Sequence, residues 1–298
     1  MDETSDEQAA VRIAGAVREW DLGATCLAAL AVVTDGAAGG DLAATARAVM
    51  AAAGLGDVLA DPPRMPFSAE QVHGMAASPL LQATALVSGS HADWSAHSDE
   101  TLIAQGRASA SAATLFTTFV LPHFAGFADR LARPGARMLD VGTGVGALAI
   151  GYAQAFPQLH VTGLDVMPRV LRLAQAQIEA SPVAERVEVR QADVAELADE
   201  AAYDLAWIPA PFIPQPAFSN GVARIAAALR PGGMLMIGHG IYEGTELENA
   251  IARFKTVGYG GTPLDGESAA RLLAAHGLTA IRRIQLPPGA PGLTVGLR

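Results

Sequence analysis

The spacing of apolar positions changes near residue 133. Up to residue 132, long segments rich in alanine and leucine show no alternation of apolar and polar residues, and this composition favours helices. After Pro134 and Gly135, which mark a turn, short apolar runs alternate with segments of helical character. We therefore predict a helical N-terminal domain over residues 1–132 and an α/β domain over residues 133–298.

Two segments interrupt the helical half. Residues 35–40 contain three glycines, and residues 61–66 are stiffened by prolines. Ser68 and Asp99 are predicted N-caps, because their side chains can accept from free N–H groups. We predict helices over Gln8–Val17, Leu22–Thr34, Leu42–Leu59, Ser68–Met75, Ser78–Val87, Glu100–Val120 and Pro122–Leu131.

The second half has the strand and helix order of a doubly wound parallel sheet. Seven strands are predicted, over Arg137–Val141, His160–Asp165, Val187–Gln191, Tyr203–Ile208, Met234–Gly238, Thr279–Gln285 and Leu293–Leu297. The predicted helices are Val145–Ala155, Pro168–Ala180, Ala217–Leu229, Thr245–Val257 and Glu267–His276. A turn is predicted over residues 231–233, where a proline precedes two glycines.

The most informative stretch runs from Arg137 to Gly146, where an apolar strand enters a glycine-rich turn ahead of a helix. Glycine permits positive φ angles and lets a ligand approach the backbone, and a helix N-terminus offers free N–H groups. Asp140 lies two residues before the first glycine, and Asp165 ends the next strand. The spacing from the turn to Asp165, about 20 residues, suits an acid that binds ribose hydroxyls. A G-x-G pattern alone also fits dinucleotide sites.

This pattern resembles the class I S-adenosyl-L-methionine (SAM)-dependent methyltransferases. Their first motif has the form acid-x-Gly-x-Gly-x-Gly, and a second acid ends their second strand. The resemblance covers residues 133–298. It implies a seven-stranded, doubly wound, Rossmann-like methyltransferase sheet beside an all-helical N-terminal domain. It also implies SAM as cofactor and S-adenosyl-L-homocysteine (SAH) as product.

By this resemblance, the glycine turn holds the methionine part of SAM, and the acids that end the next two strands bind the ribose and the adenine. The residues expected to bind the cofactor are Asp140, Gly142, Gly144, Gly146, Asp165, Met167, Asp193, Val194, Ile208 and Arg107. Arg107, on the helix that approaches the sheet, is expected near the SAM carboxylate. Asp165 and Asp193 also fit a structural role as helix N-caps.

The substrate side of the site is expected after the fourth strand, in the run from Ile208 to Pro214. Methyltransferases of planar nitrogens often carry Asn-Pro-Pro-aromatic there; this chain lacks the Asn, which argues against DNA, glutamine and rRNA amines. The residues expected to contact substrate are Phe212, Tyr242, His91 and Trp94. His239 is the candidate catalytic base, since a neutral imidazole accepts a proton. Stiff-loop or packing roles remain alternatives for each of them.

Composition and charge narrow the partners. The 298 residues carry a formal net charge of −10, and the basic residues are scattered rather than clustered, so nucleic acid is not an expected partner. No long apolar run predicts a membrane span, and the acidic N-terminus does not resemble a signal peptide. The single Cys26 favours a reducing compartment, so a cytoplasmic location is expected. No metal site is predicted.

Together these features predict a methyltransferase of bacterial secondary metabolism that acts on a small aromatic or apolar metabolite, free or carrier-bound. O-methylation is favoured, N- or C-methylation stays open, and a homodimer is expected through the helical domain. One alternative is an NAD(P)-dependent oxidoreductase, although no Tyr-x-x-x-Lys motif is present and Lys255 is the sole lysine. A SAM-binding protein without catalysis is another.

Overall fold

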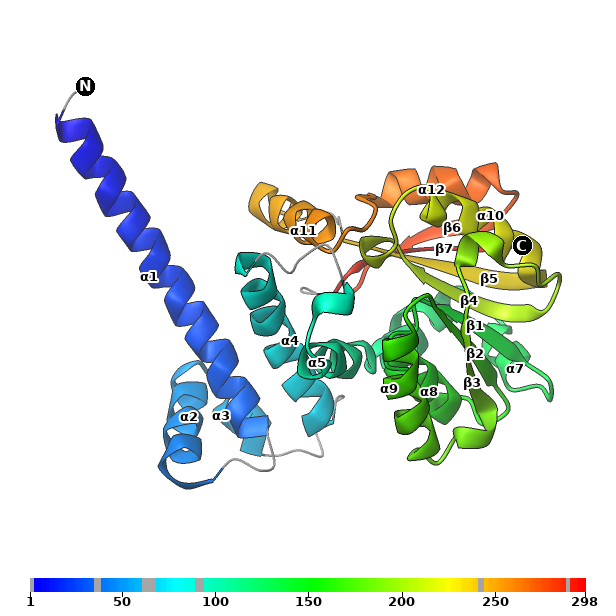
Figure 1. Ribbon diagram of the computed structural model, residues 1–298, viewed down its shortest axis with the longest axis horizontal. Helices are drawn as coiled ribbons and strands as arrows, with labels where there is room; N and C mark the ends of the chain where they lie inside the picture. The colour runs from blue at the N-terminus through cyan, green and yellow to red at the C-terminus, as the bar shows by residue number, and fades with distance from the viewer. Residues whose placement is uncertain (1–2, 35–38, 61–67, 89–93, 241–243, 288–289) are drawn as a thin grey trace. The chain divides into compact units, whose positions relative to one another are not determined.

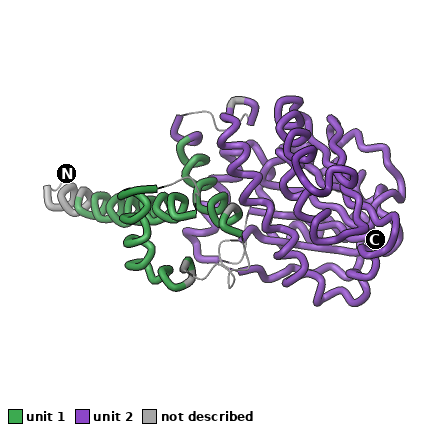
Figure 2. The backbone as a smooth tube through the Cα atoms, turned by 90° about the horizontal axis from the view of Figure 1, so that it is seen from below, with its two compact units in different colours: residues 1–84 green, residues 85–298 purple. Residues whose placement is uncertain are grey.

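The computed structural model describes residues 3–34, 39–60, 68–88, 94–240, 244–287 and 290–298. The chain separates into two compact units, Met1–Thr84 and Ala85–Arg298 (Figure 2). Residues 85–132 therefore pack in the same unit as the sheet. The predicted domain boundary between residues 132 and 133 separates proposed functions rather than compact units, and it stays a prediction.

Helices form the first unit: α1 (Glu3–Thr34), α2 (Gly40–Ala52), α3 (Gly56–Ala60) and most of α4 (Ala69–Val87). A small core buries Ala29, Ala46 and Met50. His73 Nδ1 lies 2.9 Å from the carbonyl oxygen of Ala31, which joins α4 to α1. Partly buried aliphatic side chains, among them Leu30, Val33 and Leu59, pack against these residues and complete the core.

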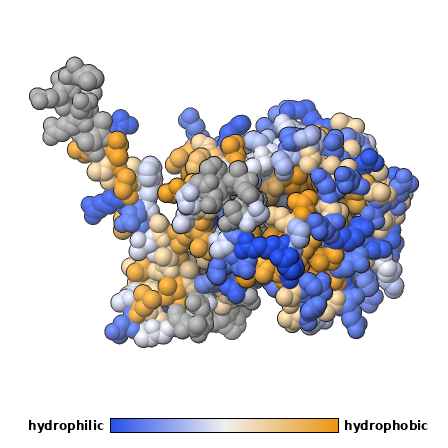
Figure 3. Space-filling model, viewed as in Figure 1, coloured by the Kyte–Doolittle hydropathy of each residue, from blue (hydrophilic) through white to orange (hydrophobic). Residues whose placement is uncertain are grey.

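Two predicted helix breaks are absent. The segments predicted as separate helices before and after residue 20 form the continuous α1, and α4 continues through Pro79. Several large apolar side chains of α1 are exposed, namely Val11, Ile13, Val17, Trp20 and Leu22. Figure 3 shows orange atoms along the described part of this helix. Ile13, Val17 and Trp20 follow a spacing of four and three residues, so they share one face of the helix.

The second unit begins with short helices rather than the single predicted helix over residues 100–120. They are η2 (Trp94–Ala96), α5 (Asp99–Ser109), α6 (Ala112–Leu115), the π-helix η3 (Phe116–Val120), η4 (Leu121–His123) and α7 (Phe127–Leu131). Ser98, not Asp99, is the N-cap of α5, because its side chain accepts from the backbone N–H of Thr101. The prediction was wrong here because nothing in the local composition marks the turn at residues 110 and 111.

The sheet has seven strands: β1 (Arg137–Val141), β2 (His160–Asp165), β3 (Val187–Gln191), β4 (Tyr203–Pro209), β5 (Leu229–His239), β6 (Thr279–Ile284) and β7 (Gly292–Leu297). Their order is β3-β2-β1-β4-β5-β7-β6. The first five strands are parallel, and β7 pairs antiparallel with both β5 and β6. The turn predicted over residues 231–233 is wrong, because these residues belong to a bulged part of β5.

Helices cover both faces of the sheet (Figure 1). They are α8 (Ala147–Ala155), α9 (Pro168–Glu179), α10 (Ala217–Ala228) and α12 (Gly266–Ala275). Helix α11 (Glu246–Gly258) follows β5 and contributes to neither core. Alternate residues of one strand enter different cores: Met138 packs with α8 and α9, and Leu139 packs with α10 and α12. This is the two-sided burial of a doubly wound sheet, and it brings the carboxyl ends of β1, β2, β3 and β4 to one edge.

A buried carboxylate fixes the opposite edge of the sheet. Asp204, near the start of β4, accepts from Arg130 Nε at 2.9 Å, from Arg230 Nη1 at 2.6 Å and from the backbone N–H of Arg137 at 3.0 Å. Only 6% of its side chain is exposed. One charge therefore ties α7, β1 and β5 to β4, well away from the glycine turn.

Candidate cofactor and substrate site

The glycine turn joins β1 to α8 with three residues in the left-handed region. Gly142, Gly144 and Gly146 have φ angles of 66°, 56° and 80°. A side chain would strain the backbone at each of these positions. A Cβ built on Gly144 meets no atom within 4 Å, so this part of the turn faces open space. The turn therefore has the exposed backbone that a ligand can lie against.

Asp140 is buried directly beneath this turn. Its carboxylate accepts a 2.7 Å hydrogen bond from Thr143 Oγ1, and 1% of the residue is exposed. Burial raises the pKa of Asp140 to about 7, against the Thr143 hydrogen bond, and the charge of Asp165 adds to the increase. The acid of the motif is thus held inside the turn rather than displayed on its surface.

Asp165 connects the tip of β2 to the same turn. Its carboxylate oxygens accept from the backbone N–H groups of Gly144 and Met167, each at 3.0 Å. Burial raises its pKa, although those backbone hydrogen bonds oppose the shift. Met167, not Asp165, is the N-cap residue of α9, so the N-cap alternative for Asp165 is wrong; Asp165 instead binds the backbone just before the helix. Each oxygen keeps a second lone pair, so this role leaves acceptors for a ligand.

Asp193 and Val194 follow β3 and begin a short 3-10 helix, η6 (Val194–Glu196). Asp193 Oδ1 accepts from the N–H of Ala195 at 2.8 Å, again the capping alternative. The side chain of Val194 packs on α10, where a Cβ on Gly221 would stand 2.7 Å from Val194 Cγ1. Packing on α10 therefore leaves only the backbone of Val194 for a ligand.

The run after β4 is held rigidly at the same edge. Ile208 is fully buried, and the 3-10 helix η7 (Ala210–Phe212) follows. Thr262, after α11, donates its N–H to the carbonyl of Ala210 and its hydroxyl to that of Ile213, both at 2.8 Å. This anchoring fits the expected stiff crossover and also fixes the half-buried ring of Phe212 beside the tip of β4.

Helix α5 packs directly on the glycine turn. A Cβ on Gly106 would stand 2.2 Å from Val145 Cγ2, so only glycine permits this approach. Leu102 of α5 joins Val145 and Val170 in a small buried cluster, with Trp94 and Met167 packed against it. Arg107 is half-buried on the same helix. Its predicted contact with the SAM carboxylate stays a prediction.

Four side chains from three separate stretches of the sequence form an aromatic cluster, namely Trp94, His97, Phe212 and Tyr259. The ring of Trp94 stacks on that of His97 with 4.7 Å between their centroids. Its centroid lies 5.4 Å from that of Phe212 and 5.5 Å from that of Tyr259. Phe212 and Tyr259 are 5.4 Å apart. Two of the predicted substrate residues, Trp94 and Phe212, are thus in contact with each other.

An arginine of α9 ties the segment that carries Trp94 to the sheet. Arg169 Nη1 donates to the carbonyl oxygens of Ser95 and His97 at 3.1 and 2.8 Å, and Nη2 lies 2.5 Å from Asp99 Oδ1. Arg169 lies in the first turn of α9, so this helix holds the segment that carries Trp94 and His97.

His239, the candidate base, lies at the end of β5. It is 4% exposed, and its Nε2 is 3.1 Å from Thr294 Oγ1 of β7. A Cβ on Gly266 would stand 3.4 Å from its Cε1, so its neighbours come from α12 and β7. Its catalytic role stays a prediction. The predicted substrate residues His91 and Tyr242 lie outside the described residues.

Sequence reasoning did not select Tyr259 or Arg169. Tyr259 follows α11, nearly fifty residues after Phe212, and no local pattern links the two. Burial raises the pKa of Tyr259 to about 12, so its hydroxyl stays protonated at neutral pH. Arg169 resembles an ordinary charged residue of a helix first turn; only the fold shows that it reaches back more than seventy residues.

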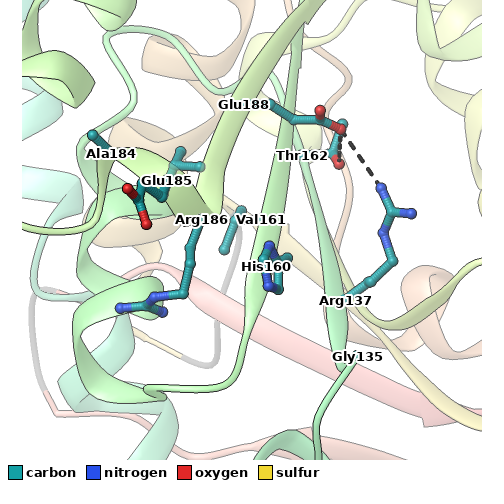
Figure 4. A pocket seen from close by; sticks show the side chains of 10 residues that line it. Gly135, Arg137, His160, Val161, Thr162, Ala184, Glu185, Arg186 and Glu188 are labelled. Carbon is teal, nitrogen blue, oxygen red and sulfur yellow. Dashed lines mark hydrogen bonds and ion pairs between the residues drawn. The ribbon is translucent and has the colours of Figure 1, made fainter.

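A surface hollow of about 480 Å³ lies at the other edge of the sheet (Figure 4). Arg137, His160 and Val187, which begin β1, β2 and β3, help to line it. Its polar groups bind one another: Glu188 Oε1 accepts from Thr162 at 2.8 Å and lies 3.6 Å from Arg137 Nη2. Ligands of such sheets bind at the carboxyl ends of the strands, so this hollow is not the expected cofactor site.

The described residues offer no candidate for a metal site or a membrane-spanning helix. They contain no group of three or more histidine, cysteine or acidic side chains able to hold a metal ion. Among them, no helix combines the length and apolar character needed to cross a membrane.

A family model described as a methyltransferase domain matches residues 138–233, which span β1 to β5 and both acids beside the glycine turn. Residues 138–233 thus match a methyltransferase domain. This confirms the predicted family and the cofactor that the domain uses. The match ends short of α11 and begins after α5, so it leaves the aromatic cluster largely outside.

Curated relatives match this chain over short segments. A release factor glutamine methyltransferase of Rhodopirellula baltica is 29% identical over 116 residues, 39% of this chain and 38% of that protein. A demethylmenaquinone methyltransferase of Deinococcus radiodurans is 32% identical over 111 residues, 37% of this chain and 45% of that protein. The matched part thus spans less than half the length of either relative.

Solved structures resemble the whole fold at low identity. Human N-acetylserotonin methyltransferase in complex with SAM has a TM-score of 0.60 at 16% identity, covering 100% of this chain and 98% of that one. The pyocyanin biosynthetic protein PhzM has a TM-score of 0.63 at 17% identity, covering 98% and 99%. The likeness confirms the predicted fold class, a Rossmann-like sheet with a helical N-terminal region.

Proposed function

We propose that this protein transfers a methyl group from SAM to a small aromatic or apolar metabolite, with oxygen favoured as acceptor over nitrogen or carbon. The observation that carries the proposal is the open glycine turn, with Asp140 buried beneath it and Asp165 bonded to it. The match of this segment to a methyltransferase domain supports it.

The residues around the turn suit the parts of SAM. The open backbone at Gly144 would lie against the methionine part, and Asp165 would accept from the ribose hydroxyls. Asp193 and the backbone of Val194 would meet adenine. Bound SAM supplies the electrophilic methyl group. The chain's own residues orient the two reactants and exclude water.

On the acceptor side, Trp94 and Phe212 would form an apolar wall for a flat substrate. His239 is the proposed base; its contact with Thr294 would orient the imidazole ring. A carrier-bound substrate and a place in cytoplasmic secondary metabolism belong to the same proposal. A homodimer does too, supported by the exposed apolar face of α1, and light scattering coupled to gel filtration tests it.

Calorimetric titration with SAH and with NADH tests the cofactor. We expect SAH to bind and NADH not to bind. Replacing Asp165 with alanine should weaken SAH binding by about 1.5–3 kcal/mol, the loss for hydrogen bonds to a charged group. Asp129→Ala is the matched control, since Asp129 is an exposed acid on α7. Binding of NADH without SAH would refute the proposal and favour an oxidoreductase.

A further inference from the structure

The aromatic cluster contains a hydrogen-bond donor without an acceptor. The indole Nε1 of Trp94 is buried and has no hydrogen-bond partner within the part of the chain that the structure describes. Leaving such a group unpaired costs about 1–3 kcal/mol, so it calls for an explanation. The rings of Trp94 and Phe212 are each only half-buried, so part of both rings remains accessible beside this donor.

A second unpaired donor lies on α11, one turn before Tyr259. Lys255, the only lysine of the chain, is half-buried and makes no hydrogen bond or ion pair with a described residue. Burial lowers its pKa. Its ammonium group has lost part of its hydration, and an anionic partner would offset that loss.

The fold places Lys255 on the side of α11 that faces the cluster. Residues four apart share a helix face, so Lys255 lies beside Tyr259, and Ala252 and Thr256 of the same side are buried. Arg253 lies on the exposed side. A Cβ on Gly261 would stand 1.9 Å from the carbonyl oxygen of Pro211, so the segment after α11 is held against η7.

We propose that the acceptor substrate is a planar aromatic carboxylic acid, which rests on the proposed methyltransferase function. Its ring packs on Phe212 and Trp94, its carboxylate pairs with the ammonium group of Lys255, and a ring oxygen accepts from Trp94 Nε1–H. An anion at Lys255 supplies the missing counter-charge, and an oxygen substituent supplies the missing acceptor. Trp94 and Lys255 are therefore specificity-determining residues.

Matched probes test this on the protein saturated with SAH. In calorimetric titrations, 3-hydroxy-2-naphthoate and 2-naphthol present the same ring and ring oxygen with and without a carboxylate. We expect 3-hydroxy-2-naphthoate to bind at least about tenfold more tightly, a difference of about 1.4 kcal/mol. Lys255→Met should abolish this preference and Lys255→Arg should retain most of it. Arg253→Met, which removes a cation from the exposed side of the same helix, should leave it unchanged.

Trp94→Phe keeps an aromatic ring but removes the N–H group. It should weaken binding of 3-hydroxy-2-naphthoate several-fold more than binding of 2-naphthoate, because only the former carries a ring oxygen. Circular dichroism and SAH titration of each variant report on folding and on the cofactor site. A general loss of SAH binding in Lys255→Met would show that the lysine supports the cofactor site, and would overturn the assignment.

Equal affinity of the native protein for 3-hydroxy-2-naphthoate and 2-naphthol, no binding of either, or an unchanged preference in Lys255→Met would also overturn the inference. SAH binding in those experiments would leave the proposed function standing. Failure of the native protein to bind SAH would refute the proposed function itself, so the two outcomes are distinguishable.

Discussion

Replacing Asp140 with asparagine should remove a pH-dependent part of the free energy of unfolding. Burial raises the pKa of Asp140 from 3.8 to about 7, although the hydrogen bond from Thr143 opposes the increase and Asp165 adds to it. In the unfolded chain the same group ionises near pH 4 (about 3.9). Between these values the folded protein keeps a proton that the unfolded chain has released, so stability falls as pH rises.

The size of the effect follows from the same shift. One pKa unit corresponds to about 1.4 kcal/mol, so raising the pH from about 5.5 to about 8.5 should lower the free energy of unfolding by about 2 kcal/mol through this group. Above about pH 8 the carboxyl group is ionised in both states and adds no further loss. Asparagine cannot ionise, yet it keeps an oxygen that accepts from Thr143.

Guanidinium unfolding of the native protein and of Asp140→Asn, at about pH 5.5 and about pH 8.5, measures the difference. The native protein should lose about 2 kcal/mol more than the variant between these values. Asp129→Asn, which alters an exposed acid, should behave like the native protein. Equal losses in native protein and Asp140→Asn would show that the carboxyl group is not protonated in the fold, and the account of its burial would be wrong.

Further substitutions test the elements around the site. Gly106→Ala should lower the free energy of unfolding by about 1–3 kcal/mol, because its Cβ would clash with Val145. The control Gly23→Ala, whose Cβ would lie in open space on α1, should be neutral or stabilising by up to about 1 kcal/mol. Denaturant titration of both variants compares the two free energies. Asp204→Ala should cost about 2–4 kcal/mol by leaving two partly buried arginines unpaired, and a thermal scan showing no loss would contradict its tying role. Arg169→Gln should increase deuterium uptake over residues 94–99 with SAH binding retained; unchanged uptake would show that the arginine does not hold this segment.

The strands that lead to the cofactor turn were predictable because each lies between distinct local signals. β1, β2 and β3 have the predicted bounds, since short apolar runs stop at acids, glycines or polar residues. Residues 231–233 were not, because long-range pairing overrides their turn preference. The N–H of Gly232 donates to the carbonyl oxygen of Arg298, and the N–H of Arg298 donates to that of Gly233.

The same distinction applies to the site. Three glycines and two acids lie within thirty residues, so a single short window of sequence predicts the glycine turn and its acids. In the structure the three glycines have positive φ angles, and Asp165 accepts from the N–H of Gly144. The aromatic cluster depends on contacts between residues 94, 212 and 259, which no single window of sequence contains. Trp94 and Phe212 were selected separately as candidates. Their contact, and the part played by Tyr259, follow only from the fold.

The aromatic cluster is assembled from three separate stretches of chain, and two of them lie outside the segment shared with other methyltransferases. Under the proposed function, gene duplication followed by substitutions in those two stretches would give a daughter enzyme a new acceptor while its binding of the methyl donor stayed the same. Libraries that randomise residues 94–98 and the inward side of α11 are therefore a direct route to altered products.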